Sequence, residues 1–156
     1  MMRAIFIKRL GLMALLLVLQ VAAIAAPGGE RRIEQQIYEL INEYREQNGL
    51  PPLQYNKDVA DMAHYHSRRM ADKDVPFGHT GFQDRYNVLK RELPDMTAGA
   101  ENVAYGADDA TEAVELWLRS AGHKKNIRGN FTHTGISVVR DSDGRLYFTQ
   151  LFVKLQ

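Results

Sequence analysis

Residues 99–126 read GAENVAYGADDATEAVELWLRSAGHKKN. An amphipathic helix is expected to begin after Asp109, because Asp109 and Glu112 have the spacing of an N-terminal capping box. The buried side of this helix is built around Trp117, the only tryptophan of the chain. Gly122 is predicted to end the helix. His123 would then lie just past the C-terminus, where the helix dipole favours a protonated imidazole.

Two further polar residues flank this helix in the sequence. Glu101 lies ahead of it in a run of small residues, and His79 lies further upstream in the turn Phe77-Gly78-His79-Thr80. A histidine next to a glycine in a turn is free to point into a cleft. We hypothesise that His79, Glu101 and His123 meet in one cleft and that this cleft is the functional site.

The composition is that of an ordinary globular domain. The 156 residues are 25% charged and 45% hydrophobic, which suits one domain with a full core. Without residues 1–25, which carry three basic residues and no acid, 17 basic residues face 19 acidic ones, a net charge of −2. This balance predicts no nucleic-acid partner. The chain has no cysteine, which excludes disulfides, thiol catalysis and thiolate metal sites.

The N-terminus has the pattern of an export signal. A basic start is followed by an apolar run over residues 10–26, interrupted only by Gln20, and then by the small residues Ala23-Ile24-Ala25. We predict a signal peptide over 1–25 that is cleaved near Ala25, a short linker over 26–32, and one domain over 33–156 that is secreted or periplasmic. The alternative is a membrane anchor formed by residues 10–26, although a span usually takes about 20 apolar residues.

The remaining periodicity predicts an α+β fold. Helices are expected over residues 30–48, after Asn56, and over 82–93, followed by a hairpin of strands 135–139 and 146–153. Residues 94–99 are expected to form a loop. His66 falls on an apolar helix face and is expected to be a satisfied core histidine, and the amide of Gln150 is expected to bond to a neighbouring loop. Helices should pack on a mostly antiparallel sheet.

Seven short motifs resemble one known family when taken in order. They are Leu40-Ile41-Asn42-Glu43-Tyr44-Arg45 with Gly49-Leu50 and Leu53, Ala63-His64-Tyr65-His66-Ser67, Phe77-Gly78-His79, Glu101-Asn102-Val103-Ala104, Trp117 with residues 120–127, Phe131-Thr132 with Gly135, and residues 147–152. The pattern resembles the CAP superfamily (cysteine-rich secretory proteins, antigen 5 and pathogenesis-related 1 proteins) in its cysteine-free bacterial form. The resemblance implies secretion and an α-β-α sandwich with a mostly antiparallel sheet of three or four strands between helical layers.

The resemblance also implies a site. His79 and His123 look like the two histidines of the family cleft, and Glu101 looks like its first glutamate, so that these three residues are the predicted ligands of Zn²⁺ or another divalent cation. The second family glutamate would fall at Ser120. The predicted cleft also includes Asn102, Ser120, Asn126 and Gln150.

Three hypotheses for the function remain open. The favoured one is a secreted binding module for a small apolar ligand, a peptide or a cell-wall component, with a divalent metal as an optional part and membrane contact only through the uncleaved signal segment. The second is a metal-assisted hydrolase of peptides or peptidoglycan, in which Glu101 would be a metal ligand or the general base. The third is a purely structural network of two imidazoles and a carboxylate.

Overall fold

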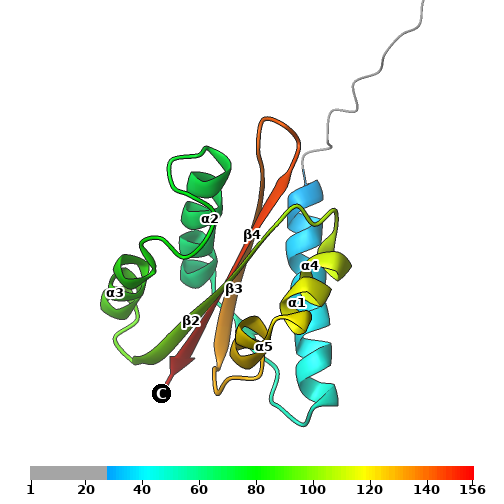
Figure 1. Ribbon diagram of the computed structural model, residues 1–156. Coiled ribbons are helices and arrows are strands. Elements are labelled where there is room, and N and C mark those ends of the chain that lie inside the picture. Colours follow the sequence, from blue (N-terminus) through cyan, green and yellow to red (C-terminus); the bar gives the residue numbers. More distant parts are fainter. Residues whose placement is uncertain (1–27) are drawn as a thin grey trace, which may run out of the picture.

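The computed structural model describes residues 28–156 (Figure 1). The predicted signal peptide and the apolar run 10–26 lie outside the described residues. The elements follow in the order α1 (Gly29–Gln47), β1 (Gln54–Tyr55), α2 (Lys57–Ala71), α3 (Phe82–Glu92), β2 (Met96–Tyr105), α4 (Ala110–Arg119), α5 (Ala121–Ile127), β3 (His133–Arg140) and β4 (Leu146–Leu155). Within this part of the chain, no helix combines the length and the apolar character that crossing a membrane requires.

One four-stranded sheet lies at the centre, with strand order β1-β3-β4-β2. The strand pairs β3–β4 and β4–β2 are antiparallel, as the C-terminal hairpin predicts. Strand β1, which the sequence analysis did not predict, adds a short parallel pairing of Gln54–Tyr55 with His133–Thr134. The sheet is therefore mixed, and β1 and β2 lie at its opposite ends.

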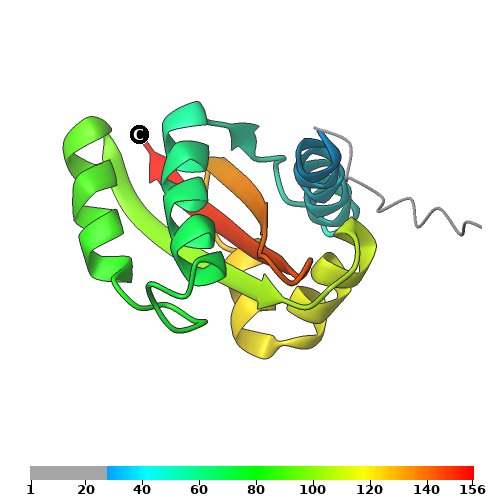
Figure 2. The same cartoon turned by 90° about the horizontal axis from the view of Figure 1, so that it is seen from above.

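Helices cover both faces of the sheet, which makes the predicted α-β-α sandwich (Figures 1 and 2). Helices α1, α4 and α5 lie on one face, where Trp117, Phe148 and Phe152 are fully buried in the larger core cluster. Helices α2 and α3 lie on the other face, and α2 packs there on Leu151 and Val153. Phe148 and Phe152 lie on one side of β4. Leu151 and Val153 lie on the other side, because successive side chains of a strand alternate between its faces.

Local signals explain where the helices begin. The side chain of Asn56 accepts a hydrogen bond from Val59 N at the start of α2, and that of Asp109 accepts one from Glu112 N at the start of α4. Helix α1 begins at Gly29, so it includes four residues of the predicted linker 26–32. Strand β2 begins at Met96, within the predicted loop 94–99, with a register shift between Met96 and Ala98.

The prediction that Gly122 ends the fourth helix is wrong. Helix α4 ends at Arg119, and Ser120, with an extended backbone (φ −84°, ψ 121°), separates it from α5. Gly122 lies inside α5, whose residues turn toward β2 rather than continuing the axis of α4. This break places the first turn of α5, with His123, beside the edge strand of the sheet.

Candidate functional site

Glu101 lies at the floor of the site. It belongs to edge strand β2, and its side chain is 2% exposed. Arg85, from α3, donates to both carboxylate oxygens, with Nε–Oε2 at 2.9 Å and Nη2–Oε1 at 2.8 Å. The guanidinium is itself only 3% exposed, and its Nη1 donates to Thr80 O at 2.8 Å. A bidentate, buried pair of this kind has a fixed geometry.

Two histidines adjoin the Arg85–Glu101 pair. His79 Nδ1 donates to Glu101 Oε1 at 2.9 Å, while the His79 side chain stays 51% exposed. His66 is buried, as predicted; its Nε2 donates to Gly78 O at 2.7 Å and lies 3.8 Å from Glu101 Oε1. Burial, the largest influence, lowers the pKa of His66 although the Glu101 carboxylate opposes this shift.

Gly78 allows the turn that carries His79 to take its shape. Its φ is +135°, which residues with a side chain rarely adopt. The turn aims the Gly78 carbonyl at His66 and places His79 over Glu101. The glycine at this position is therefore required by the backbone of the turn.

His123 approaches from the other side. Its ring centre lies 6.4 Å from that of His79, so the structure brings His79, Glu101 and His123 together. The prediction that His123 lies past a helix C-terminus is wrong, because it is the third residue of α5. Burial lowers the pKa of His123, and the neighbouring His79 lowers it further, so the imidazole is favoured in its neutral form.

Two asparagines fix α5 against β2. Asn126 Nδ2 donates to Glu101 O at 3.2 Å and to Asn102 Oδ1 at 2.9 Å. Asn102 Nδ2 in turn donates to His123 O at 3.2 Å. Asn102 and Asn126 therefore position His123 relative to Glu101, through bonds to the backbone of both residues.

The two other predicted cleft residues have different surroundings. Gln150 is fully buried directly opposite Asn102 in the sheet, and its Nε2 donates to Thr134 Oγ1 at 3.2 Å. The expected bond from Gln150 to a loop is wrong, because Thr134 lies on the adjacent strand β3. Ser120 is half-buried between α4 and α5, and its side chain caps neither helix.

The donor atoms do not suit a tightly held divalent cation. Both oxygens of Glu101 accept from Arg85, and His79 Nδ1 is bonded to Glu101. The guanidinium places a positive charge next to any ion that Glu101 would bind. Among residues 28–156, no group of three His, Asp or Glu side chains is arranged to hold a metal. Metal ligation by His79, Glu101 and His123 therefore stays a prediction that this geometry does not favour.

Two buried neighbours of Glu101, Arg85 and His66, were not predicted to belong to the site. Arg85 pairs with the acid of the site itself. One signal was available: Arg85 lies four residues before the buried Leu89, so the two share a helix face. His66 was expected to be a core residue, but nothing local indicated that its neighbour would be Glu101.

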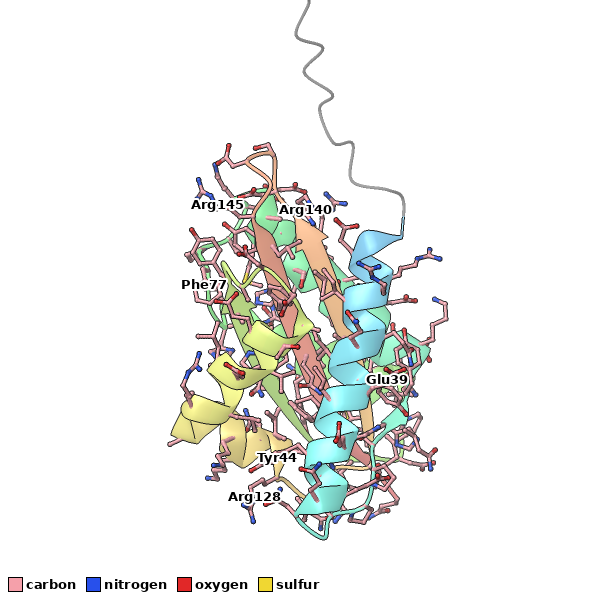
Figure 3. The ribbon with its side chains drawn as sticks, turned by 90° about the vertical axis from the view of Figure 1, so that its right-hand side faces the viewer. Glu39, Tyr44, Phe77, Arg128, Arg140 and Arg145 are labelled. Atoms are coloured by element: carbon pink, nitrogen blue, oxygen red, sulfur yellow. The ribbon has the colours of Figure 1, made fainter. Side chains whose placement is uncertain are left out.

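A row of three aromatic rings starts in the same turn as His79, and its last ring, Tyr147, is buried. Phe77 and Tyr105 are 51% and 41% exposed, and their ring centres are 5.7 Å apart. Tyr105 continues to Tyr147 with a separation of 5.0 Å. Figure 3 shows Phe77 at the margin of the molecule away from α1, on the same side as Arg145. The row gives the site an apolar surface beside its polar groups.

Comparison with known proteins shows which family has this sequence pattern and fold. Residues 38–152 match the family model of the cysteine-rich secretory protein family, CAP. Two proteins of Bacillus subtilis (strain 168) are similar in sequence: the uncharacterized membrane protein YlbC is 36% identical over 126 residues, and the uncharacterized protein YkwD is 32% identical over 132 residues. These matches cover 78% and 83% of this chain but 34% and 50% of the relatives, so the chain spans at most about half of their length.

Solved structures agree with the sequence matches. An extracellular protein from Bacillus anthracis that contains an SCP domain superposes with a TM-score of 0.69 at 32% identity, covering 80% of this chain and 41% of that one. An outer surface protein of Borrelia burgdorferi superposes with a TM-score of 0.68 at 20% identity, covering 81% and 95%, and shares the fold. With its cysteine-free sequence and its α-β-α sandwich, the chain belongs to the cysteine-rich secretory protein (CAP) family.

Proposed function

We propose that the domain is an extracellular binding module whose site, formed by His79 and His123 beside the Arg85–Glu101 pair, binds a peptide or a cell-wall fragment. The observation that carries the proposal is the engagement of both Glu101 oxygens by Arg85. This carboxylate is also only 2% exposed, so it is poorly placed to reach a proton of water or of a substrate, as a general base must. The cleft is therefore better equipped for binding than for hydrolysis.

The exposed groups of the cleft suit a partly polar ligand. His79 leaves its Nε2 for a ligand, since Nδ1 is bonded to Glu101. The half-buried His123 adds a second imidazole, favoured as the neutral form that both donates and accepts a hydrogen bond. The Phe77–Tyr105 row beside them offers flat apolar surface. A few placed polar groups next to aromatic rings are typical of ligand sites.

The extracellular location rests on two supports. The first is the predicted signal peptide over residues 1–25, and the second is the similarity to a Bacillus anthracis protein described as extracellular. The similarity to a Bacillus subtilis membrane protein is compatible with the alternative, an anchor formed by residues 10–26. Both arrangements place the cleft outside the cytoplasm, where peptides and cell-wall fragments are available as ligands.

The test is co-sedimentation of the protein with purified peptidoglycan sacculi, together with calorimetry on soluble muropeptides released from them. The His79→Ala/His123→Ala double variant is expected to lose most of the binding. His133→Ala is the matched control, because His133 is a half-buried histidine at the start of β3 and lies outside the site. Equal binding by the double variant and the wild type, or no binding by either, would reject the proposal.

A further inference from the structure

A hollow lies away from the His79–Glu101–His123 site, at the opposite end of the sheet. It has a volume of about 950 Å³ and is bounded by α1, α2 and residues 136–140 of β3. Figure 2 shows β3 between these two helices, with β1 beside it. The hollow is a groove whose floor is the edge of a β-sheet.

The groove runs along an unpaired strand edge, where Ile136 and Val138 are each only 3% exposed. Strand β1 pairs with β3 only at His133 and Thr134, and the chain then turns into α2 at Lys57. The even-numbered residues of β3 face this edge, because Thr134 O accepts from Asn56 N and Val138 N donates away from β4. Ile136, Val138 and Arg140 therefore direct their backbone N–H and C=O groups into the groove.

One of these groups is already occupied by a side chain. Glu34, from α1, accepts a hydrogen bond from Val138 N at 2.8 Å. Within residues 28–156, the outward N–H groups of Ile136 and Arg140 and the outward carbonyls of Ile136 and Val138 have no protein partner. The Glu34 carboxylate thus accepts from Val138 N in the way that a backbone carbonyl of a neighbouring strand would.

We propose that residues 136–140 of β3 form a docking edge for an extended peptide, which pairs with the strand between α1 and α2 after its carbonyl replaces Glu34 on Val138 N. Adding a strand to an exposed sheet edge is a recurrent mode of peptide recognition. The edge offers five residues, which a strand of about 17 Å would span. The peptide would continue the track along which β1 already pairs with β3.

The recess selects a single chain and excludes a second copy of the protein. Helices α1 and α2 rise on either side of the edge, and a helix with its side chains is about 10–12 Å wide. The β3 edge of a second copy would be recessed by its own α1 and α2, so the helices would collide before the strands could pair. A lone extended peptide has no such flanks.

The charges that line the groove nearly cancel, so they do not favour a strongly charged ligand. Arg31, Lys57, Arg68 and Arg140 nearly balance Glu30, Glu34 and Asp61. Glu30 is bonded to Arg140, and Lys57 is paired with Asp61, so part of this charge is already matched. Recognition would therefore rest on the backbone, and the ligand class is a neutral or weakly acidic peptide.

The test follows backbone amides by NMR in the ¹⁵N-labelled full chain, with the blocked peptide acetyl-Thr-Val-Thr-Val-Thr-amide as the probe. We expect shift changes at Ile136, Val138 and Arg140 and slower hydrogen exchange at Ile136 and Arg140. Acetyl-pentaproline-amide, which has no backbone N–H to pair, should leave these amides unchanged. Changes confined to β2, or equal effects of both peptides, would overturn the proposal.

Three variants sharpen the result. Glu34→Ala removes the competing acceptor and should tighten binding of the probe about five-fold, the value of one hydrogen bond. His64→Trp places a large ring in the groove and should abolish binding, whereas Tyr65→Trp, on the exposed side of the same helix, should not. Unchanged affinity in His64→Trp would reject the site even if Glu34→Ala does not fold. If the amide chemical shifts of residues 136–140 change with protein concentration when no peptide is present, the edge pairs with a second copy of the protein. That result would also overturn the proposal.

Discussion

Arg85 and Glu101 form a two-bonded ion pair that is almost completely removed from water, with 3% and 2% of their side chains exposed. The pair joins α3 to the edge strand β2, and His79 rests on it through Glu101 Oε1. It therefore determines both the stability of this corner of the sheet and the chemistry left to the cleft.

Breaking the pair on one side should be strongly destabilising. Arg85→Ala leaves a buried carboxylate without its cation and should lower the free energy of unfolding by about 3–5 kcal/mol. The double variant Arg85→Met/Glu101→Leu should recover most of this loss, because it buries no charge. Urea denaturation of the wild type, Arg85→Met, Glu101→Leu and the double variant forms a double-mutant cycle that measures the coupling.

The exposed Arg119–Glu115 pair is the control for this cycle. Its side chains are 63% and 58% exposed, and its atoms are 3.2 Å apart. Pairs in water contribute at most about 1 kcal/mol. A coupling at Arg85–Glu101 no larger than that of this surface pair would contradict the importance given to the buried pair.

Stability should fall as the solution becomes mildly acidic. Burial lowers the pKa values of His66 and His123 below the ordinary histidine value of 6.5 in the folded protein. Between pH 6.5 and those lower values, the unfolded chain binds more protons than the folded one, so the free energy of unfolding decreases as pH drops through this window. Above pH 6.5, the stabilisation that the neutral His66 and His123 contribute is fully present. Urea denaturation between pH 8 and pH 5 measures it.

Replacing either histidine should weaken the dependence of the free energy of unfolding on pH. His66→Gln keeps a donor for Gly78 O but does not titrate, and His123→Gln likewise removes one proton site. Each variant should show a smaller loss of stability between pH 7 and pH 5 than the wild type at the same ionic strength. A wild-type stability that rises on acidification would contradict the expected direction of the pH dependence.

The parts of the fold that could be predicted depend on local signals. Asn56 and Asp109 cap the helices that follow them, and each bonds a backbone N–H three residues ahead. Alternation of apolar residues likewise predicts the β3–β4 hairpin. Two-residue β1 has no such signal, because its pairing partner His133–Thr134 is nearly 80 residues away in the chain.

The proximity of three residues could be predicted from the sequence, whereas the buried Arg85–Glu101 pair could not. The meeting of His79, Glu101 and His123 agrees with the hypothesis from the sequence. The break at Ser120 could not be predicted, because the bonds of Asn126 to Glu101 and Asn102 on β2 hold α5 in place. Burial of Arg85 depends equally on a carboxylate sixteen positions along the chain. Both are tertiary effects that outweigh local propensity.

Zinc should not bind tightly at the cleft. Arg85 holds both Glu101 oxygens, and Ser120 stands where the family resemblance places a second acid. Titration calorimetry of the metal-stripped protein should show no saturable one-to-one binding at micromolar concentration. The His79→Ala/His123→Ala variant should give the same trace as the wild type. Stoichiometric binding that disappears in this variant would contradict the expectation and reopen the metal-assisted hydrolase hypothesis.

Gly135 should tolerate no side chain, because α2 lies directly on β3 at this point. A Cβ atom there would come within 2.1 Å of Ala60 N and 2.3 Å of Val59 C, and both are backbone atoms that no rotamer change can move. Gly135→Ala should therefore lower the free energy of unfolding by about 3 kcal/mol or more, since relief requires lifting the helix from the sheet. Gly122→Ala is the matched control: it lies in α5 with no atom within 4 Å of the added Cβ, and it should be neutral or stabilise by up to about 1 kcal/mol. Thermal and urea denaturation of the two variants test the contrast, and a Gly135→Ala protein as stable as Gly122→Ala would mean that α2 and β3 are not in this close contact.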